Sequence, residues 1–462
     1  MPDGLVLHIA LTMAVLAPSA RAAAPAFPGA EGWGRNARGG GQDEKTKVLL
    51  VTSVADAGPG TLREALNTRG PRIIIFKTGG IIDLKSRLSF SEGRVTVAGQ
   101  TAPGDGIILK NYPLRLGASD VIIRGLRVRN GDGPGPKGEL RDGVAIGGGD
   151  GKPSHDIIID HCSFGWSVDE AVDFWYGARD VTLSYNIISE ALWKSIHHKG
   201  SHGYAMLIAN GDNQLITVHH NLFAHNERRN PWVKDNAGVE IINNVIYNWG
   251  TEATGLWLGK DSKSPFKPCF VNVIGNYYKG GEATLSRIKK GARFIDLHLP
   301  PATGSRFYIH DNLGPGRTED KQDDWDAVDV GQFDRAPYRV NEPAAEITSG
   351  LKAQKPGDAY ESVLKRAGAV PRDNADTRAV ADTRSAGGRH IDRMEQIGGY
   401  PAYAPGTPAP DADGDGMPDE WERAHRLDPN DKADATKFSA GNSGYLNIEE
   451  YINSLFPDNQ RE

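Results

Sequence analysis

The stretch ITVHHNLF, residues 216–223, shows a pattern that recurs along much of the chain. Its first and third residues are apolar, as expected for a β-strand that buries one face. The same pattern occurs in six further segments: VIIRGLRV (121–128), IIIDHCSF (157–164), VTLSYNII (181–188), VEIINNVI (239–246), VNVIGNYY (271–278) and FYIHDNLG (307–314). Successive segments start 23 to 36 residues apart, so each repeat holds one such strand and a connection of variable length.

A repeat of this length predicts a solenoid, because one coil cannot bury its apolar face without a neighbour stacked on it. The sixth position of the pattern is asparagine in five segments, at Asn186, Asn221, Asn244, Asn276 and Asn312. Asparagines in one column of successive coils can form a side-chain ladder that satisfies buried backbone groups. We therefore expect an all-β protein, a parallel β-helix. The alternative is an antiparallel sandwich with coincidental asparagine turns.

Strands also precede the repeat, at residues 48–51, 73–76, 94–98 and 106–109, with a short helix in TLREAL. The 56 glycines and 24% charged residues fit a turn-rich β protein. The 53 Lys+Arg nearly balance the 59 Asp+Glu, so the overall charge gives no indication of nucleic-acid binding. No apolar run reaches the roughly 20 residues of a membrane span, and we expect a monomer.

The chain divides into four predicted parts. Residues 1–24 read as a signal peptide, with an apolar run followed by small residues, although no positive charge precedes the run; a buried core segment is the alternative. Residues 25–320 form the predicted β-helix. Residues 321–410 are a polar segment wrapping back over it, with a helix at 359–369 and a Pro-rich linker at 401–410. Residues 411–462 form a small calcium module.

That module begins with DADGDGMPDEWE, residues 411–422, which matches the calcium-loop template D-x-D-x-D-G-x5-E. Gly416 allows the sharp turn and Met417 offers its carbonyl. A solvated acidic loop is the alternative, and Pro418 is unusual in such a loop. The carboxylates available to the ion are those of Asp411, Asp413, Asp415, Asp419 and Glu422.

The two cysteines, Cys162 and Cys269, are not expected to pair. Cys162 occupies the inward asparagine column, and Cys269 lies four coils later. At about 4.8 Å per coil the two are roughly 19 Å apart, beyond the reach of a disulfide. We expect two free thiols.

Acidic and basic residues cluster in the middle of the repeat. Within SVDEAVDF, strand alternation predicts Asp169 and Asp173 on one face and Glu170 on the other. With Asp142 from the preceding coil they could bind a hard cation such as Ca²⁺, or they could be solvated surface carboxylates. Basic residues follow at Lys194, Lys199, Arg228, Arg229 and Lys234. The histidines of HHKGSH, with His202 last, extend this basic surface and lack a recognised zinc-ligand spacing.

Several motifs together resemble the pectate lyases of polysaccharide lyase family one. They are FPGAEGWG, AGQTAPGDG, IIIDHCSF, SVDEAVDF, SYNII, HHNLFAHNERRNP and INNVIYNWG, spread over residues 26–320. The tail resembles those of many secreted bacterial members. The resemblance implies a secreted, right-handed parallel β-helix that cleaves pectate, an acidic polysaccharide, with the help of Ca²⁺.

The resemblance also assigns roles by position. It implies calcium binding by Asp142, Asp169 and Asp173, and a catalytic base at Arg229, two residues before Pro231. For substrate binding it implies Lys199 or Lys194, of which we prefer Lys199, together with Lys234, Arg228 and His202. One departure is Leu140, where many members have a further aspartate; Glu139 or Asp132 could replace it.

The implied reaction is β-elimination on a 4-linked uronate polymer. Arg229 removes the C5 proton of the sugar beside the scissile bond. Because arginine has a pKa of about 12.5 or more, we expect an alkaline optimum. The alternatives are a non-catalytic β-helix that binds acidic polysaccharide, a lyase acting on another uronate polymer, and a glycoside hydrolase, which needs two suitably spaced carboxylates.

Overall fold

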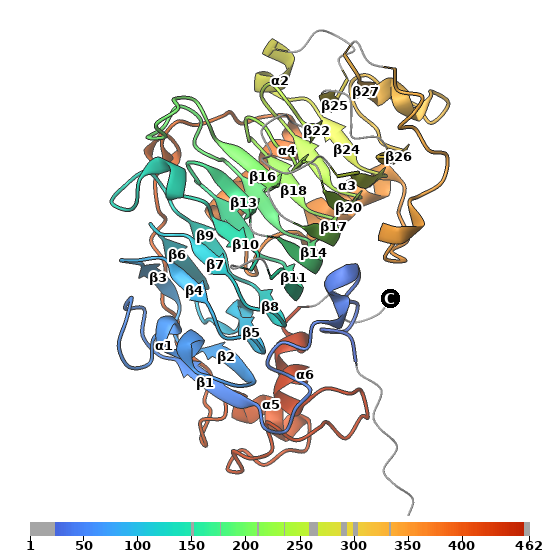
Figure 1. Ribbon diagram of the computed structural model, residues 1–462. Helices are drawn as coiled ribbons and strands as arrows, with labels where there is room; N and C mark the ends of the chain where they lie inside the picture. The colour runs from blue at the N-terminus through green and yellow to red at the C-terminus, as the bar shows by residue number, and fades with distance from the viewer. Residues whose placement is uncertain are drawn as a thin grey trace, which may run out of the picture.

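The computed structural model describes residues 24–148, 152–175, 177–209, 212–234, 236–257, 267–287, 293–298, 304–331 and 334–456. The predicted signal peptide, apart from Ala24, lies outside the described residues. Within the described part of the chain, strands stack in sequence order into three parallel sheets, which is a parallel β-helix (Figure 1).

The largest sheet has ten strands in the described residues: β1 (Lys47–Val51), β2 (Arg72–Phe76), β5 (Val95–Ala98), β8 (Val121–Arg124), β11 (Ser154–Asp160), β14 (Ala178–Ser184), β17 (Asn213–His219), β20 (Ala237–Ile242), β23 (Phe270–Ile274) and β26 (Arg306–His310). A second sheet has nine: β4 (Leu88–Phe90), β7 (Leu114–Leu116), β10 (Val144–Ile146), β13 (Glu170–Phe174), β16 (Tyr204–Ile208), β19 (Trp232–Val233), β22 (Thr254–Trp257), β25 (Ile295–His298) and β27 (Val328–Asp329). The third has eight: β3 (Gly80–Asp83), β6 (Ile107–Lys110), β9 (Arg127–Arg129), β12 (Ser163–Gly165), β15 (Ile187–Ser189), β18 (Leu222–Ala224), β21 (Val245–Tyr247) and β24 (Tyr277–Lys279).

The predicted repeat register is confirmed. The first residue of each repeated segment pairs with the first residue of the next, from Val121 with Ile157 through to Val271 with Phe307. All these pairings are parallel, which excludes the antiparallel sandwich. The apolar side chains at these positions fill the interior of the coil.

The asparagine column forms the expected ladder. The Nδ2 atom of Asn186 donates to Oδ1 of Asn221 at 2.9 Å, and the same bond joins Asn221 to Asn244, Asn244 to Asn276 and Asn276 to Asn312 at 2.8–3.0 Å. Each of these asparagines is completely buried. The ladder therefore satisfies polar groups that the turns would otherwise leave without partners.

Helices cover parts of the solenoid surface. They are α1 (Leu62–Asn67), α2 (Glu282–Arg287), α3 (Pro356–Arg366), α4 (Asn374–Ser385), α5 (Asp419–Ala424) and α6 (Asn447–Ser454). Val363 and Leu364 of α3 and Ala379 of α4 pack against the eight-stranded sheet at Ile187 and Leu222. The N-terminal end of α4 is fixed by ion pairs from the buried Arg129 to Asp373 and Asp376, at 3.0 and 2.8 Å.

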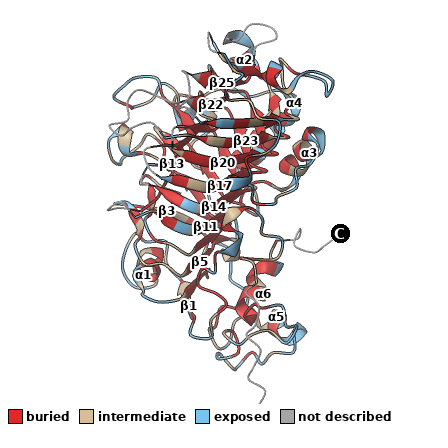
Figure 2. Ribbon diagram, turned by 45° about the vertical axis from the view of Figure 1, so that its right-hand side comes forward, coloured by how far each residue is buried: buried red, intermediate tan, exposed pale blue. Residues whose placement is uncertain are grey.

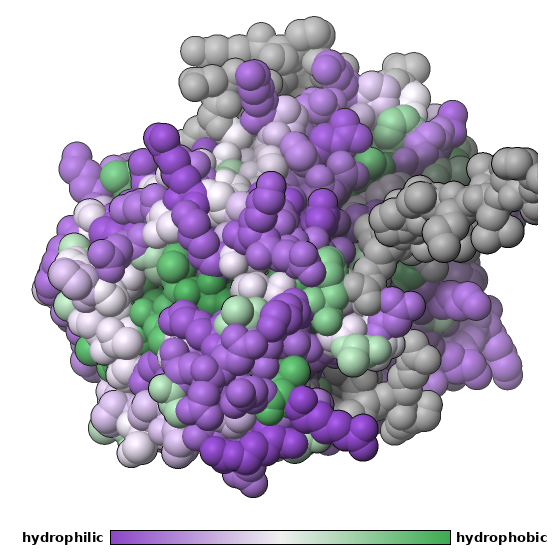
Figure 3. All heavy atoms as spheres, turned by 90° about the horizontal axis from the view of Figure 1, so that it is seen from below, coloured by the Kyte–Doolittle hydropathy of each residue, from purple (hydrophilic) through white to green (hydrophobic). Residues whose placement is uncertain are grey.

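The C-terminal segment packs against the first coils of the solenoid (Figures 1 and 2). Met417, Leu446 and Ile448 are buried against Ile73 and Ile75 of β2. Seen from this end, the surface is mostly hydrophilic, with a hydrophobic patch between hydrophilic groups (Figure 3). The C-terminal segment and the first coils thus share one apolar cluster.

Both cysteines are buried and free, as predicted. None of the described helices is long and apolar enough to cross a membrane.

Candidate active site

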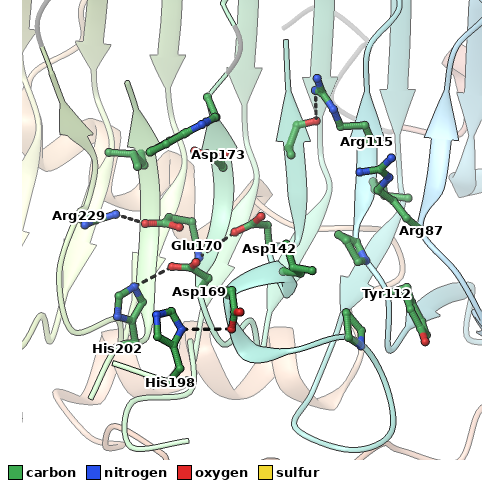
Figure 4. Close-up of a pocket in the computed structure, with 18 of the residues that line it drawn as sticks. Arg87, Tyr112, Arg115, Asp142, Asp169, Glu170, Asp173, His198, His202 and Arg229 are labelled. Atoms are coloured by element: carbon green, nitrogen blue, oxygen red, sulfur yellow. Dashed lines mark hydrogen bonds and ion pairs between the residues drawn. The ribbon is translucent and has the colours of Figure 1, made fainter. Parts of the chain in front are cut away.

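A cleft of about 750 Å³ is built on strands β7, β10, β13 and β16 of the nine-stranded sheet (Figure 4). Carboxylates lie at its centre and cations lie on both sides of them. The acidic, basic and histidine residues that line it are Arg87, Arg115, Glu139, Asp142, Asp169, Glu170, Asp173, His198, Lys199, His202, Arg229 and Lys234.

Four carboxylates meet in the middle of this cleft. Oxygens of Asp142, Asp169 and Glu170 lie within 4.8 Å of one another, and Asp173 follows on the same strand as Glu170. Burial, together with the repulsion of the neighbouring carboxylates, raises the pKa of Asp142 and of Asp173 well above the usual value. Burial likewise raises the pKa of Asp169, and that of Glu170 to about 7. A cation bound among the four carboxylates would offset the repulsion between them.

The prediction that Glu170 lies on the face opposite Asp169 is wrong. Asp169 lies just before β13, and within the strand the alternation is broken, because the successive residues Ala171 and Val172 both lie in the apolar interior. Asp169 and Glu170 therefore reach the same cleft as Asp173.

The residues fit a hard divalent cation. All four donors are carboxylates, and one buried oxygen, Oδ1 of Asp173, has no hydrogen-bond partner among the described residues. Such an all-oxygen set suits Ca²⁺. Leu140 lies at the rim, 56% exposed, and contributes no donor. Glu139 also lines the cleft and pairs with His198 at 3.2 Å, whereas Asp132 is not among the lining residues.

Two stacked histidines hold Asp169. The rings of His197 and His202 lie 3.8 Å apart and nearly parallel, and their Nε2 atoms lie 3.5 and 2.7 Å from the two oxygens of Asp169. Nδ1 of His197 accepts a hydrogen bond from the backbone N–H of Lys199, which places the proton of the neutral ring on Nε2. Burial lowers the pKa of each histidine to about 4.

In this tautomer Nε2 of His197 carries the proton and cannot ligate a metal, so the three residues are poorly suited to a transition metal although their ligand atoms lie within 4.8 Å. The close contact of Asp169 is with His202, on which the ring of His197 stacks.

Arg229 lies beside the carboxylates on the β16 side. Its guanidinium pairs with Glu170 and lies 4.3 Å from the centre of the Tyr204 ring and 4.5 Å from that of Trp232. Its carbonyl accepts from the N–H of Met206 in β16 at 2.8 Å. Its backbone is left-handed, with φ 64°, a conformation that costs a non-glycine residue about 1 kcal/mol or more. These contacts thus hold the guanidinium of Arg229 in one orientation, facing the cleft.

The other predicted basic contacts divide into two groups. Lys199, Lys234 and His202 line the cleft. Lys194 lies against its neighbour Trp193, with 4.0 Å from Nζ to the ring centre, and is not among the lining residues. Arg228 also lies outside the lining and donates from Nε to Glu252 at 2.8 Å.

The C-terminal loop holds a second carboxylate group. Asp411, Asp413 and Asp415 form one set of converging oxygens, and Asp415, Glu422 and Asp434 form another. Both oxygens of the fully buried Glu422 lack a hydrogen-bond partner among the described residues. Burial and the adjacent carboxylates raise the pKa of Asp415 and of Glu422 to about 7.

The carboxylates of the C-terminal site differ from the calcium-loop template at two residues, one inside the loop and one beyond it. The Asp419 carboxylate accepts from the N–H of Ala412 at 2.8 Å and pairs with Arg423, and it is in neither set of converging oxygens. Sequence reasoning missed Asp434; the acidic segment DPNDKADA, residues 428–435, was the available signal.

The comparisons with known proteins agree on one family, although no family model matches the chain. The chain is 36% identical over 438 residues to "Probable pectate lyase C" of Aspergillus flavus, covering 94% of each chain. It is 33% identical over 458 residues to the protein of that name from Emericella nidulans, covering 98% of this chain and 97% of the relative. These relatives are fungal, so they give no support to the bacterial type suggested by the tail.

Solved structures share the fold. The major cedar pollen allergen jun a 1 matches 74% of this chain and 93% of its own with a TM-score of 0.51 and 20% identity. The thermostable pectate lyase PL 47 matches 74% of this chain and 97% of its own, with a TM-score of 0.51 and 14% identity. The identity and extent of the fungal matches show that the chain belongs to the pectate lyase family.

Proposed function

We propose that this protein is a secreted, calcium-dependent lyase that cleaves 4-linked polygalacturonate by β-elimination, leaving a 4,5-unsaturated end. The observation that carries the proposal is the position of the Arg229 guanidinium beside four carboxylates in one cleft. The relatives named pectate lyase support the substrate class.

The carboxylates of Asp142, Asp169, Glu170 and Asp173 would hold the catalytic ion. When bound, Ca²⁺ supplies Lewis-acid withdrawal of charge from the C6 carboxylate of the sugar, which makes the C5 proton more acidic. Lys199 and Lys234 line the same cleft and bind further substrate carboxylates.

Arg229 accepts the C5 proton in this proposal. The electron pair of the C5–H bond forms the C4–C5 double bond as the C4–O bond breaks, and the departing glycosidic oxygen takes a proton from water. Tyr204 and Trp232 hold the guanidinium in place, so that its orientation is set before substrate arrives. A guanidinium is rarely neutral at pH 7, so activity should rise toward alkaline pH.

The C-terminal loop would hold a second, structural Ca²⁺ through Asp411, Asp413, Asp415, Glu422 and Asp434. The unpartnered buried oxygens of Glu422 support this proposal. Because Met417 of the loop packs against β2, an ion there would stabilise the contact between the C-terminal segment and the first coils.

The deciding experiment is incubation with polygalacturonate, first with calcium and then with a chelator. A calcium-dependent rise in the ultraviolet absorbance of unsaturated product is the expected result. New reducing ends without that absorbance would indicate hydrolysis. Binding of the polymer without either product would indicate a non-catalytic polysaccharide-binding protein.

A further inference from the structure

Two arginines occupy the end of the cleft away from Arg229. Arg115 lies in the middle of β7, and Arg87 directly precedes β4. Both line the cleft, and Figure 4 shows both side chains on the side of the carboxylates opposite Arg229. The exposed Arg87 side chain has no hydrogen bond or ion pair within the described part of the chain, while Arg115 reaches the carbonyl of Ala145 at 3.4 Å.

The strand register sets the distance from this pair to the carboxylate cluster. Arg115 pairs with Ala145 in the next coil, and Ala145 pairs with Asp173 in the coil after that. At about 4.8 Å per coil, Arg115 lies roughly 10 Å from Asp173 along the axis of the solenoid. The small side chain of Ala145 lies between them and leaves the floor of the cleft open from Arg115 to Asp173.

The side chains at this end of the cleft are suited to binding a sugar acid. A guanidinium can bind a carboxylate through two parallel hydrogen bonds. Tyr112 lines the same part of the cleft, and the 40% exposed ring of Trp175 follows Asp173 and its strand. Aromatic rings offer apolar faces against which a sugar ring can pack while its polar groups stay hydrated.

We propose that Arg87 and Arg115 form a second carboxylate-binding site, which holds a uronate of the same polysaccharide chain two to three coils from Asp173. This inference rests on the proposed function for its ligand. Its consequence is that the protein discriminates by chain length, because only a chain that reaches from Arg229 past Asp173 can also contact these arginines.

The test uses Arg87→Gln and Arg115→Gln, singly and together, with a galacturonate trimer and an octamer as substrates. We expect KM for the octamer to rise about tenfold in the double variant, with kcat little changed, because a charge-assisted carboxylate contact is lost. The trimer, too short to span both sites when it occupies the reacting centre, should show no such change. The matched control is Arg179→Gln, an arginine in β14 of the ten-stranded sheet.

A binding measurement separates this inference from the proposed function. Octamer affinity is measured by calorimetry with calcium, in an Arg229→Lys background that prevents turnover. A weaker octamer affinity in the double variant supports the site even if the wild-type protein cleaves nothing, which would refute only the lyase proposal. Equal octamer affinity, or an equal loss for trimer and octamer, overturns the inference.

Discussion

The Nε2 atom of His202 lies 2.7 Å from a carboxylate oxygen of Asp169, at the edge of the proposed calcium site. The contact is buried, and the stacked ring of His197 keeps His202 from turning away. Asp169 is therefore held in one orientation before any cation binds. A histidine in this position acts on the metal through its ligand, as supporting groups around metal sites commonly do.

Replacing His202 should therefore weaken calcium binding at the cleft. We expect His202→Leu to lower calcium affinity roughly 10- to 100-fold, and His202→Gln, whose amide can still donate, to lower it less. Calorimetric titration with calcium measures this, with Asp142→Asn as the reference that removes the same binding event. The control is His155→Leu, because His155 forms an exposed pair with Asp156 on the ten-stranded sheet. Unchanged affinity in His202→Leu would refute the supporting role.

The two adjacent arginines should differ in their effect on catalysis. Arg229→Lys keeps a positive charge but loses the planar guanidinium held between Tyr204 and Trp232, and we expect kcat to fall by about 100-fold or more. Arg228→Lys is the matched control, because Arg228 pairs with Glu252 outside the cleft lining and should lose far less. Initial rates on polygalacturonate give both values.

Calcium titration of the same variants completes this test. Affinity should persist in Arg229→Lys, since that residue is not a ligand. A near-wild-type rate in Arg229→Lys would rule out its assignment as the base.

The fold was predictable because its determinants are local. A period-2 apolar pattern and one asparagine per coil repeat within short segments, so the strand register follows from aligning those segments with one another. The helix α4 and the buried pairing of Arg129 with Asp376 were not predictable, because the partners lie 247 residues apart in the chain.

The candidate site was predictable only in part. Asp142, Asp169 and Asp173 were identified by position, and the structure brings them into one cleft. Glu170 was misplaced because two successive residues of β13, Ala171 and Val172, both face the interior, and a period-2 pattern does not reveal such an interruption. Asp434 was missed because it joins the loop only after the chain folds back on it.

The C-terminal loop should couple calcium to stability. In Glu422→Gln, we expect the gain in melting temperature on adding calcium to be smaller than in the wild-type protein. An ion at 100 times its Kd stabilises the folded state by about 2.7 kcal/mol, and this variant loses part of that amount. Asp434→Asn should act in the same direction, whereas Glu420→Gln, a neighbouring exposed carboxylate outside both sets, should not.

Activity measured at low temperature distinguishes an effect on the C-terminal loop from an effect on the cleft. It should be retained in Glu422→Gln, because the loop lies at the first coils and not in the cleft. An equal calcium-dependent shift in Glu422→Gln and wild type would contradict the structural ion.

The buried His220 should make the fold sensitive to acid. Its ring stacks on Tyr185, Nε2 lies 3.3 Å from Oε1 of Gln354, and Nδ1 lies 2.9 Å from Nδ1 of His219. Burial, assisted by the positive charge of Arg366, lowers the pKa of His220 from 6.5 to about 4. The unfolded chain therefore binds this proton more readily than the folded one.

The sign of the pH effect follows from that difference. The stabilisation of the folded state by the neutral ring is complete above pH 6.5 and is lost as the pH falls from 6.5 to about 4. The full loss is about 3 kcal/mol. Denaturant unfolding at pH 7 and near pH 4.5 should show a smaller acid-induced loss of stability in His220→Phe than in the wild-type protein. His155→Phe, which changes an exposed histidine, should leave the wild-type loss intact, and an identical loss in all three proteins would show that His220 is not the group responsible.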